Sequence, residues 1–468
     1  MKTFIAVSAP LSGFPKITVP FIFGASPDKP FLMRISVLGE RPMIINVENI
    51  PDGISLEGNM LVGTAPSAGE YPITVFAENK LGKAKKDIVI SVAPDGALRT
   101  PLLGFTTWNA FASAVEQKNV EDTADYFIES GISEYGYSYI NLDSGWQDNY
   151  GGEYDAIMPN ANFPDMKGMY DKLHSLGFKG GIYSSPFMQA WGCPDGVEYI
   201  PGCTRGERDI RFPDENTGIG LDRREAACVR QWCDWGVDYL KYDWKPTEPV
   251  NADLMKTELL KASRDIPMCV TVAASDLYKD YWNKNCCSWR WNDDTWDEWN
   301  NITERFKTLD RWRGKTSVGH FYDLDMLAIG VMHWSQGRLT DEEELTAFTL
   351  HSFFPSPVQL SMQMDKLSET EKRIIGNEDM ISVNQDILCD YPEHLPDING
   401  VTVYRRKLVD GKAYAFFNLS DKSVSFDYKL DSDGFVYNVW EKRSQGLGFT
   451  NIIKVELDPH ESAVFKIR

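Results

Sequence analysis

Eight apolar runs, separated by stretches with helical periodicity, occupy the middle of the sequence. An apolar run followed by a helical segment is a βα unit, and repeated βα units build a parallel sheet whose strands are buried on both faces. Eight units within about 265 residues match a closed (β/α)8 barrel better than an open doubly wound sheet, which is the structural alternative. The expected strands cover residues 102–108, 137–143, 178–184, 237–243, 268–274, 287–292, 316–323 and 358–362.

Two of the intervening segments have a clear apolar face and a clear end. In the first, Val120, Ala124, Phe127 and Ile128 share one helical face, and the helix is expected to end near Gly131. The second is expected to end at Gly236, because glycine readily adopts the left-handed conformation that terminates helices. Both segments fit the crossover helices of a barrel.

Short β-type runs with turn signals between them precede the barrel, from about residue 15 to residue 94. Their spacing predicts a small antiparallel sandwich. Two segments, Ile50-Pro-Asp-Gly-Ile-Ser-Leu56 and Gly63-Thr-Ala-Pro-Ser-Ala-Gly-Glu-Tyr71, resemble the immunoglobulin-like domains of bacterial extracellular proteins. We therefore expect an immunoglobulin-like β-sandwich at the N-terminus.

The chain becomes β-rich again from about residue 392, with runs such as Ala413-Tyr-Ala-Phe-Phe417 and Ser462-Ala-Val-Phe-Lys-Ile467. This pattern predicts a C-terminal antiparallel β-sandwich. The expected fold is thus multidomain α/β, with an N-terminal immunoglobulin-like β-sandwich (1–97), a (β/α)8 TIM barrel (98–390) and a C-terminal β-sandwich (391–468).

Charge and hydropathy exclude two classes of partner. The formal net charge of -20 repels phosphate backbones, whose affinity for proteins comes largely from Lys and Arg, so no nucleic-acid partner is expected. No window approaches 18 consecutive apolar residues, so no membrane span is expected. The sequence carries no signal of oligomeric state.

Cysteine and histidine spacing does not indicate a metal site. The eight Cys form no CxxC pair and the six His form no HxH or HExxH motif, so no metal and no cofactor are expected. Cys193 and Cys203 are the nearest plausible disulfide partners. The first ten residues carry one positive charge and a short apolar stretch, too little for a signal peptide.

Acidic residues recur where the expected strands end, which is where barrels place catalytic side chains. Asp143, Asp243, Asp294 and Asp325 all lie at or just beyond such ends. One of them alone could simply cap the next helix. Glycoside hydrolysis through a covalent intermediate needs two carboxyls about 5 to 5.5 Å apart, and residues on the fourth and sixth strands of one barrel can meet this demand. Asp243 and Asp294 are the expected pair.

Three further residues near these ends have both a functional and a structural interpretation. Lys241 lies two residues before Asp243 and therefore points to the same interior face, where it either holds that carboxylate ionised or forms a buried ion pair. Arg290 either binds a substrate hydroxyl or pairs with an acid. Trp108, at the end of the first strand, either stacks on a sugar face or belongs to the core.

Six segments match known motifs in chain order: Thr100-Pro-Leu-Leu-Gly-Phe-Thr-Thr-Trp-Asn-Ala-Phe111 (TPPMGWNSWNxF), Tyr137-Ser-Tyr-Ile-Asn-Leu-Asp-Ser-Gly-Trp-Gln147 (GYxYINIDDCWQ), Trp235-Gly-Val-Asp-Tyr-Leu-Lys-Tyr-Asp243 (WGVDYLKYD), Arg290-Trp-Asn-Asp-Asp-Thr-Trp-Asp-Glu-Trp299, Asp323-Leu-Asp-Met-Leu-Ala-Ile-Gly330 (DPDMLVIG) and Ile381-Ser-Val-Asn-Gln-Asp386 (IAINQD). The motifs are those of glycoside hydrolase family 27, the α-galactosidase and α-N-acetylgalactosaminidase family, which the chain resembles from about residue 98 to 390.

The resemblance implies a retaining exo-glycosidase that removes terminal α-D-galactosyl residues from an oligosaccharide or polysaccharide. It assigns Asp243 as the nucleophile and Asp294 as the general acid/base, and it requires no cofactor. The residues implied to surround the sugar are Trp108, Asp143, Ser144, Tyr183, Lys241, Arg290 and Asp325.

Departures from the family motifs affect which sugar the site is expected to accept. Ser144 replaces the second Asp of the DDCW motif, which holds hydroxyls at the far end of galactose, and the loop Ala273-Ala-Ser-Asp-Leu-Tyr278 lacks the sequence that distinguishes a 2-hydroxyl from a 2-acetamido group. N-Acetylgalactosamine and β-L-arabinopyranose therefore stay open as alternatives. A catalytically silent carbohydrate-binding protein is a further alternative, although retention of both carboxylates argues against it. A periplasmic, cell-envelope or extracellular location follows from the N-terminal domain and the glycan chemistry.

Overall fold

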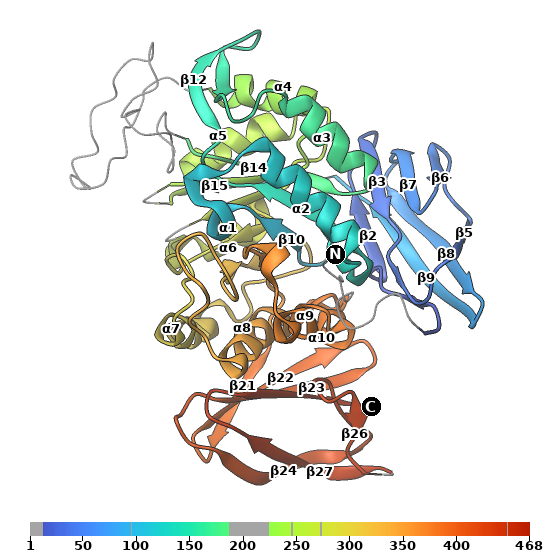
Figure 1. The fold of residues 1–468 in the computed structure, drawn as a ribbon, viewed down its shortest axis with the longest axis vertical. Helices are drawn as coiled ribbons and strands as arrows, with labels where there is room; N and C mark the ends of the chain where they lie inside the picture. The colour runs from blue at the N-terminus through green and yellow to red at the C-terminus, as the bar shows by residue number, and fades with distance from the viewer. Residues whose placement is uncertain (1–12, 95, 187–223, 245–246, 272–273, 447) are drawn as a thin grey trace, which may run out of the picture.

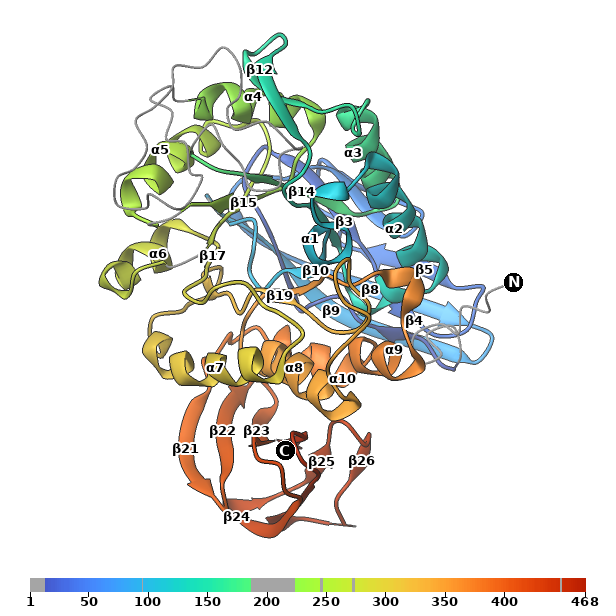
Figure 2. The ribbon, with the colours of Figure 1, turned by 60° about the vertical axis from the view of Figure 1, so that its left-hand side comes forward.

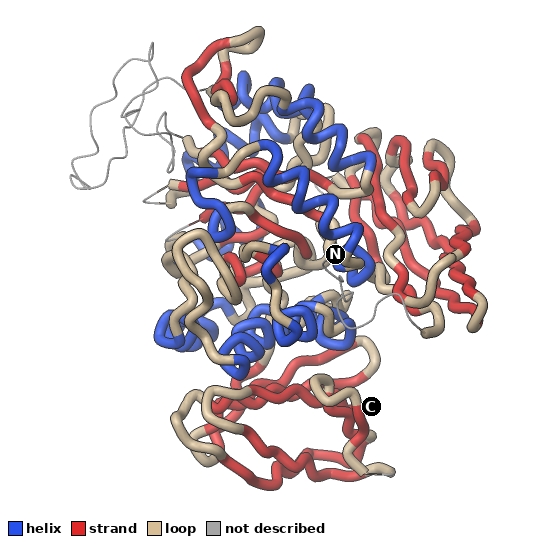
Figure 3. The backbone as a smooth tube through the Cα atoms, viewed as in Figure 1, coloured by secondary structure: helices blue, strands red, loops and turns tan. Residues whose placement is uncertain are grey.

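The computed structural model describes residues 13–94, 96–186, 224–244, 247–271, 274–446 and 448–468. A central α/β domain carries one β-rich domain at its side and another at its C-terminal end (Figure 1). Helices surround the strands of the central domain, whereas the two outer domains consist of strands and loops (Figure 3). The predicted Cys193–Cys203 pair lies outside the described residues.

Nine short parallel strands form the wall of the central domain: β10 Leu103–Thr106, β11 Tyr139–Leu142, β14 Lys179–Ser184, β15 Tyr239–Asp243, β16 Met268–Thr271, β17 Ser288–Trp289, β18 Phe321–Tyr322, β19 Met326–Leu327 and β20 Val358–Leu360. Their hydrogen-bonded order is β18-β17-β16-β15-β14-β11-β10-β20-β19. Most of these strands are buried along their whole length, as expected for strands covered on both faces. A hairpin of β12 (Gln147–Gly151) and β13 (Ala156–Pro159) extends from the loop after β11.

The two ends of this sheet, β18 and β19, are neighbours in the sequence. Only Asp323, Leu324 and Asp325 separate them, so the ring closes through the covalent chain and the two strands are halves of one barrel strand. The (β/α)8 prediction is therefore confirmed. The sequence predicted one long seventh strand over 316–323, but β18 begins only at Phe321, because Ser317 and His320 pair across a tight turn in which Gly319 has φ 84°.

Helices follow the strands in alternation: α1 Trp108–Phe111, α2 Gln117–Glu129, α3 Met166–Ser175, α4 Glu225–Trp235, α5 Pro249–Leu259, α6 Lys279–Asn285, α7 Trp299–Leu309, α8 Asp341–Phe353, α9 Glu369–Ile375 and α10 Glu378–Asn384. The apolar face predicted for α2 is fully buried at Val120, Ala124 and Phe127, whereas Ile128 is only partly buried. Helix α4 ends at Gly236, with φ 95°, as predicted.

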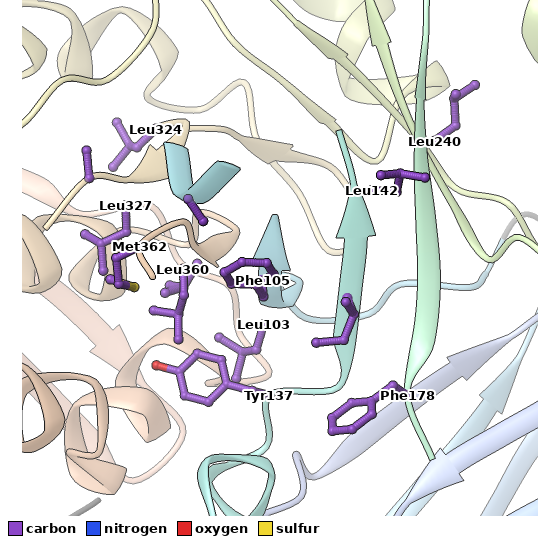
Figure 4. Packing of buried hydrophobic residues seen from close by; sticks show 14 of the residues in the cluster. Leu103, Phe105, Tyr137, Leu142, Phe178, Leu240, Leu324, Leu327, Leu360 and Met362 are labelled. Carbon is purple, nitrogen blue, oxygen red and sulfur yellow. The ribbon is translucent and has the colours of Figure 1, made fainter. Parts of the chain in front are cut away.

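Single-turn 3-10 helices occupy several connections: η1 Ala112–Ala114, η2 Ile132–Tyr135, η3 Asp276–Tyr278, η4 Asp310–Trp312 and η5 Met364–Lys366. Apolar side chains from adjacent strands fill the space between strands and helices. Leu103 and Phe105 of β10 lie near Leu142 of β11 and Leu360 of β20 (Figure 4). Because this packing is dense, the strand ends that carry the polar side chains are held rigidly.

The N-terminal domain is a sandwich of a four-stranded sheet, in the order β2-β9-β8-β5, and a three-stranded sheet, in the order β3-β7-β6, with β1 and β4 as a separate pair. The strands are β1 Lys16–Ile17, β2 Ile22–Ala25, β3 Pro30–Arg34, β4 Val37–Leu38, β5 Ile44–Glu48, β6 Ile54–Glu57, β7 Met60–Thr64, β8 Gly69–Asn79 and β9 Gly82–Val92. Glu134 of the barrel anchors the sandwich, because its carboxylate pairs with Arg34 at 2.7 Å and accepts a hydrogen bond from the amide of Val37 at 2.8 Å.

The C-terminal domain is also a sandwich, as predicted. A six-stranded antiparallel sheet, in the order β21-β22-β23-β28-β25-β26, packs on the pair β24–β27. The strands are β21 Glu393–Ile398, β22 Val401–Leu408, β23 Gly411–Asn418, β24 Val424–Gly434, β25 Val436–Asn438, β26 Arg443–Ser444, β27 Thr450–Leu457 and β28 Ser462–Ile467. Helices α7, α8 and α10 lie between the barrel strands and this sandwich (Figure 2). No described helix is both long and apolar enough to cross a membrane.

Candidate active site

The carboxylate of Asp243 is held on both oxygens by neighbouring strands. On one side, the hydroxyl of Tyr183 on β14 donates to Oδ2 at 3.0 Å. On the other, the hydroxyl of Thr271 on β16 donates to Oδ1 at 2.6 Å. Parallel pairing sets this arrangement, because Asp243 is the register partner of Thr271 and β14 is the other neighbour of β15. Asp243 is thus fixed in one orientation at the C-terminal end of its strand, and it is only half-buried.

Lys241, two residues earlier, points into the same interior but contacts a different acid. Its ammonium lies 2.7 Å from Oδ2 of Asp143, which is 2% exposed. Burial alone would lower the pKa of Lys241, but the Asp143 carboxylate outweighs this effect and the pKa is raised. Of the two interpretations that the sequence left open for Lys241, the structure shows the buried ion pair; Asp243 acts on Lys241 only as a more distant charge.

Asp143 accepts further hydrogen bonds that fix its position. The hydroxyl of Thr106 donates to Oδ2 at 3.1 Å, and the amide of Ser144 donates to Oδ1 at 2.8 Å. Ser144 itself is 1% exposed, and its hydroxyl has no hydrogen-bond partner among the described residues. An unsatisfied buried hydroxyl costs free energy, so this oxygen is ready to bind a polar ligand group.

Arg290 joins two further acids. Its guanidinium forms ion pairs with Asp294 at 2.8 Å and with Asp325 at 2.6 Å. Burial opposes the charge of Arg290, but Asp325, Asp294 and Asp243 together hold its pKa above the usual value. Asp325 is buried, whereas the side chain of Asp294 is 41% exposed. Arg290 therefore positions Asp294 while leaving it accessible to a ligand.

The charges of this site do not cancel. Four carboxyl groups (Asp143, Asp243, Asp294 and Asp325) surround two cations (Lys241 and Arg290), which leaves a formal charge of about -2 on the protein side of the site when all four are ionised and about -1 when Asp294 carries a proton. A site of this kind favours a ligand that develops positive charge.

Trp108 opens helix α1, directly beyond β10, and it is half-buried. Its ring meets that of Trp334 edge to face, with centroids 6.4 Å apart. The structure thus brings the sequence-predicted site residues together toward the C-terminal ends of the barrel strands. Hydrogen bonds or ion pairs join most of them: Asp143, Ser144, Tyr183, Lys241, Asp243, Arg290, Asp294 and Asp325.

The sequence analysis missed Thr106, Thr271 and Trp334. The two threonines could have been found from strand register, because each ends a strand next to one that carries a site carboxylate. Trp334 lies in a loop without periodicity, so no local signal marks it. Among the described residues, no three His, Cys, Asp or Glu side chains are grouped to hold a metal ion.

Comparison with known proteins connects this geometry to characterised sequences. Residues 218–386 match the family described as alpha galactosidase A, and residues 399–467 match the alpha galactosidase C-terminal beta sandwich domain. The α-galactosidase of Cyamopsis tetragonoloba is 27% identical over 391 residues, which is 80% of this chain and 87% of that enzyme. The α-galactosidase A of Cellvibrio japonicus is 27% identical over 71% of this chain and 79% of its own length.

Solved structures are similar over a larger part of the chain. A candidate α-galactosidase/melibiase from Bacteroides fragilis superposes with a TM-score of 0.87 at 27% identity, covering 99% of this chain and all of that protein (100%). The α-galactosidase I of Mortierella vinacea has a TM-score of 0.68 at 23% identity, covers 80% of this chain and 98% of its own, and bears on the fold alone.

Proposed function

The chain belongs to glycoside hydrolase family 27, the α-galactosidase family, and we propose that it is a retaining exo-glycosidase that hydrolyses terminal α-D-galactosyl residues of oligosaccharides or polysaccharides. One observation carries the proposal. Asp243 is held on both oxygens by Tyr183 and Thr271, while Arg290 presents the accessible Asp294 at the same end of the barrel. A double displacement requires a fixed carboxylate that attacks and a second, accessible carboxyl group that transfers the proton.

In the first step Asp243 attacks the anomeric carbon and the bond to the leaving oxygen breaks. Asp294 gives its proton to that oxygen, and a covalent glycosyl-enzyme forms at Asp243. The two hydrogen bonds on Asp243 hold the attacking oxygen in place, which removes much of the entropic cost of the attack. Positive charge that develops on the sugar is stabilised by the excess of carboxylates around it.

In the second step Asp294, now a carboxylate, removes a proton from water. The water attacks the anomeric carbon from the face that the leaving group occupied, and Asp243 departs, so the product keeps its anomeric configuration. The ion pair with Arg290, at 2.8 Å, holds the side chain of Asp294 in position for this step.

Recognition of the sugar is proposed to centre on Asp143, Lys241 and Ser144. The Lys241–Asp143 pair offers charged donor and acceptor groups for sugar hydroxyls, and such hydrogen bonds are worth about 1.5 to 3 kcal/mol each. The unpartnered hydroxyl of Ser144 supplies one more contact. Because Ser144 offers a neutral hydroxyl instead of a carboxylate at the far end of the sugar, β-L-arabinopyranose is a second candidate for the glycone. α-N-Acetylgalactosamine is another, because residues 273–278 lack the family sequence that distinguishes the substituent at C2.

Two finer proposals concern the surroundings of the enzyme. We infer that the N-terminal sandwich is immunoglobulin-like, which its two packed sheets and the motifs of residues 50–71 support. We also infer a periplasmic, cell-envelope or extracellular location, supported by that domain type and by the glycan substrate. Fractionation of the native host tests the location, and recovery in the cytosol with reduced cysteines contradicts it.

A panel of p-nitrophenyl glycosides tests the function: α-galactoside, α-N-acetylgalactosaminide and β-L-arabinopyranoside, assayed with the wild type, Asp243→Ala and Asp294→Ala. We expect the α-galactoside to be hydrolysed fastest, with the activity abolished in Asp243→Ala. Fastest hydrolysis of another glycoside corrects the glycone, whereas no hydrolysis of any contradicts the glycosidase assignment.

A further inference from the structure

Three tryptophans from three different βα loops meet at the mouth of the barrel. Trp108 follows β10, Trp296 follows β17 and Trp334 follows β19. The rings of Trp108 and Trp334 have centroids 6.4 Å apart, and those of Trp334 and Trp296 are 5.3 Å apart. We call these three residues the tryptophan wall. Trp334 is the central member, and Trp296 is the outermost, with 42% of its surface exposed.

The polar edge of Trp334 is turned inward. Its Nε1 atom is buried and has no hydrogen-bond partner among the described residues, although the ring as a whole is only partly buried. The accessible part of this ring is therefore carbon. Exposed aromatic carbon next to a polar site provides a flat apolar surface on which a ligand can stack.

Hydrogen bonds between the neighbours of these tryptophans fix the wall on both sides of Trp334. The amide of His333 donates to the carbonyl of Asn109 at 2.8 Å, which joins the loop of Trp334 to that of Trp108. The hydroxyl of Ser335 donates to the carboxylate of Asp297, which joins it to the loop of Trp296. Arg338 and Glu298 add an ion pair of 2.8 Å between the same two loops.

The wall begins beside the proposed general acid. Trp296 lies two residues beyond Asp294, and Asn301 binds both: its side chain accepts from the amide of Trp296 at 3.1 Å and donates to the carbonyl of Asp294 at 3.3 Å. A general acid must be within hydrogen-bond reach of the leaving oxygen. The group attached to that oxygen therefore leaves the site next to Trp296.

We propose that the tryptophan wall binds the leaving-group sugar, with the apolar face of a pyranose ring stacked on Trp296 and the edge of that sugar against Trp334, whose ring is tilted by 54° to that of Trp296. This inference rests on the proposed function, because it takes Asp294 as the acid, and it adds the residues that bind the leaving-group sugar. Three sets of contacts between the loops hold the tryptophan wall in place before the ligand arrives, so little conformational entropy is lost when the sugar binds.

Three substrates that share one glycone test the wall: an α-galactosyl-(1→6)-glucose disaccharide, p-nitrophenyl α-galactoside and α-galactosyl fluoride, whose leaving group is a single atom. Wild type, Trp296→Ala, Trp334→Ala and Trp296→Phe are compared. Phe449→Ala, which truncates an aromatic that is 75% exposed in the C-terminal sandwich, is the control. In both alanine variants we expect kcat/KM for the disaccharide to fall about tenfold and kcat/KM for the fluoride to stay within about twofold of the wild type. Trp296→Phe keeps an aromatic ring and should retain most of the wild-type kcat/KM for the disaccharide.

The remaining outcomes contradict the proposal in different ways. Equal losses on the disaccharide and the fluoride mean that the tryptophans only support the fold of the site. A loss on the aryl glycoside without a loss on the disaccharide means that the wall accepts aryl groups and not sugars. A wild type that hydrolyses none of the three substrates contradicts the proposed function, and the tryptophan wall as a sugar site with it.

Discussion

Lys241 and Asp143 form a buried ion pair of 2.7 Å although their strands, β15 and β11, are separated by β14. The contact crosses the interior of the barrel, where curvature brings side chains of non-adjacent strands together. The face of Tyr183, on the strand between them, lies 5.6 Å from the Lys241 ammonium and shields the pair from one side.

The Asp143→Asn variant is expected to lose stability as well as activity. Removing the carboxylate leaves the Lys241 ammonium buried without its partner, which costs about 3 to 5 kcal/mol. Urea denaturation measures the change in the free energy of unfolding. The double variant Asp143→Asn/Lys241→Met removes both charges and should be more stable than Asp143→Asn alone; a double variant that is less stable contradicts the ion-pair interpretation.

Thr271→Val tests the hold on the proposed nucleophile. Valine has nearly the shape of threonine but cannot donate to Oδ1 of Asp243, so kcat is expected to fall about tenfold while the folded structure persists. Steady-state kinetics on an aryl α-galactoside measures the effect. Thr271→Ser keeps the hydroxyl and should retain most of the wild-type kcat; equal losses in both variants contradict the role of the hydrogen bond.

Glu344 on α8 makes stability depend on pH near neutrality. Burial, together with the nearby Glu371, raises its pKa from 4.5 to about 7, while its carboxyl accepts a hydrogen bond from the amide of Gly330 at 2.8 Å. Because the folded-state pKa is raised, the associated stability is complete below about pH 4.5 and is lost as the pH rises through 7.

Glu344→Gln keeps an acceptor but cannot ionise. Its free energy of unfolding should exceed that of the wild type by about 3 kcal/mol at pH 8.5 and by much less at pH 5. Guanidinium denaturation at the two pH values measures this, with Glu342→Gln on the same helix as the control. A gain of the same size at both pH values contradicts the assignment.

His394 connects the C-terminal sandwich to the barrel in a pH-dependent way. Its ring lies 2.9 Å from Asp310 of the barrel and 3.1 Å from Asp397. Burial lowers the pKa of His394, but the hydrogen bonds to the two carboxylates outweigh it and the net shift is upward. The stability that it contributes is therefore present below the unfolded-state pKa, near 6.5, and is lost as the pH rises through the folded-state value.

His394→Gln should consequently lower the melting temperature more at pH 5.5 than at pH 8.5. Differential scanning fluorimetry at the two pH values gives the comparison. Glu344→Gln serves as a reference, because its effect on stability is expected to be larger at the higher pH, whereas that of His394→Gln is expected to be larger at the lower pH. A melting temperature that falls equally at both pH values contradicts the electrostatic role of His394.

Periodicity in the sequence predicts the barrel well, because each βα unit encodes its own burial pattern. Periodicity does not predict where a strand ends when the backbone leaves the sheet before the apolar run is over. The sixth strand was expected to reach Asn292 but ends at Trp289, since the chain then leaves the sheet and Arg290 can reach both Asp294 and Asp325. Strand β19 was missed because the turn at Asp325 interrupts its pattern.

The candidate site was predictable as a set of residues but not as a set of contacts. Lys241 and Asp243 share a strand face, which made them look like partners, yet pairing across a barrel depends on its curvature and not on sequence distance. The isolation of the Ser144 hydroxyl and the meeting of Trp108, Trp296 and Trp334 likewise depend on loops that come together only in the fold.

The central claim is that Asp243 is the nucleophile and Asp294 the acid/base of a double displacement. Azide rescue tests it most directly: Asp243→Gly and Asp294→Gly are incubated with p-nitrophenyl α-galactoside and azide, and NMR identifies the sugar azide formed. With Asp243→Gly, azide replaces the nucleophile and should give the β-galactosyl azide; with Asp294→Gly, azide attacks the glycosyl-enzyme and should give the α-galactosyl azide. The same anomer from both variants, or the reverse assignment, contradicts the account.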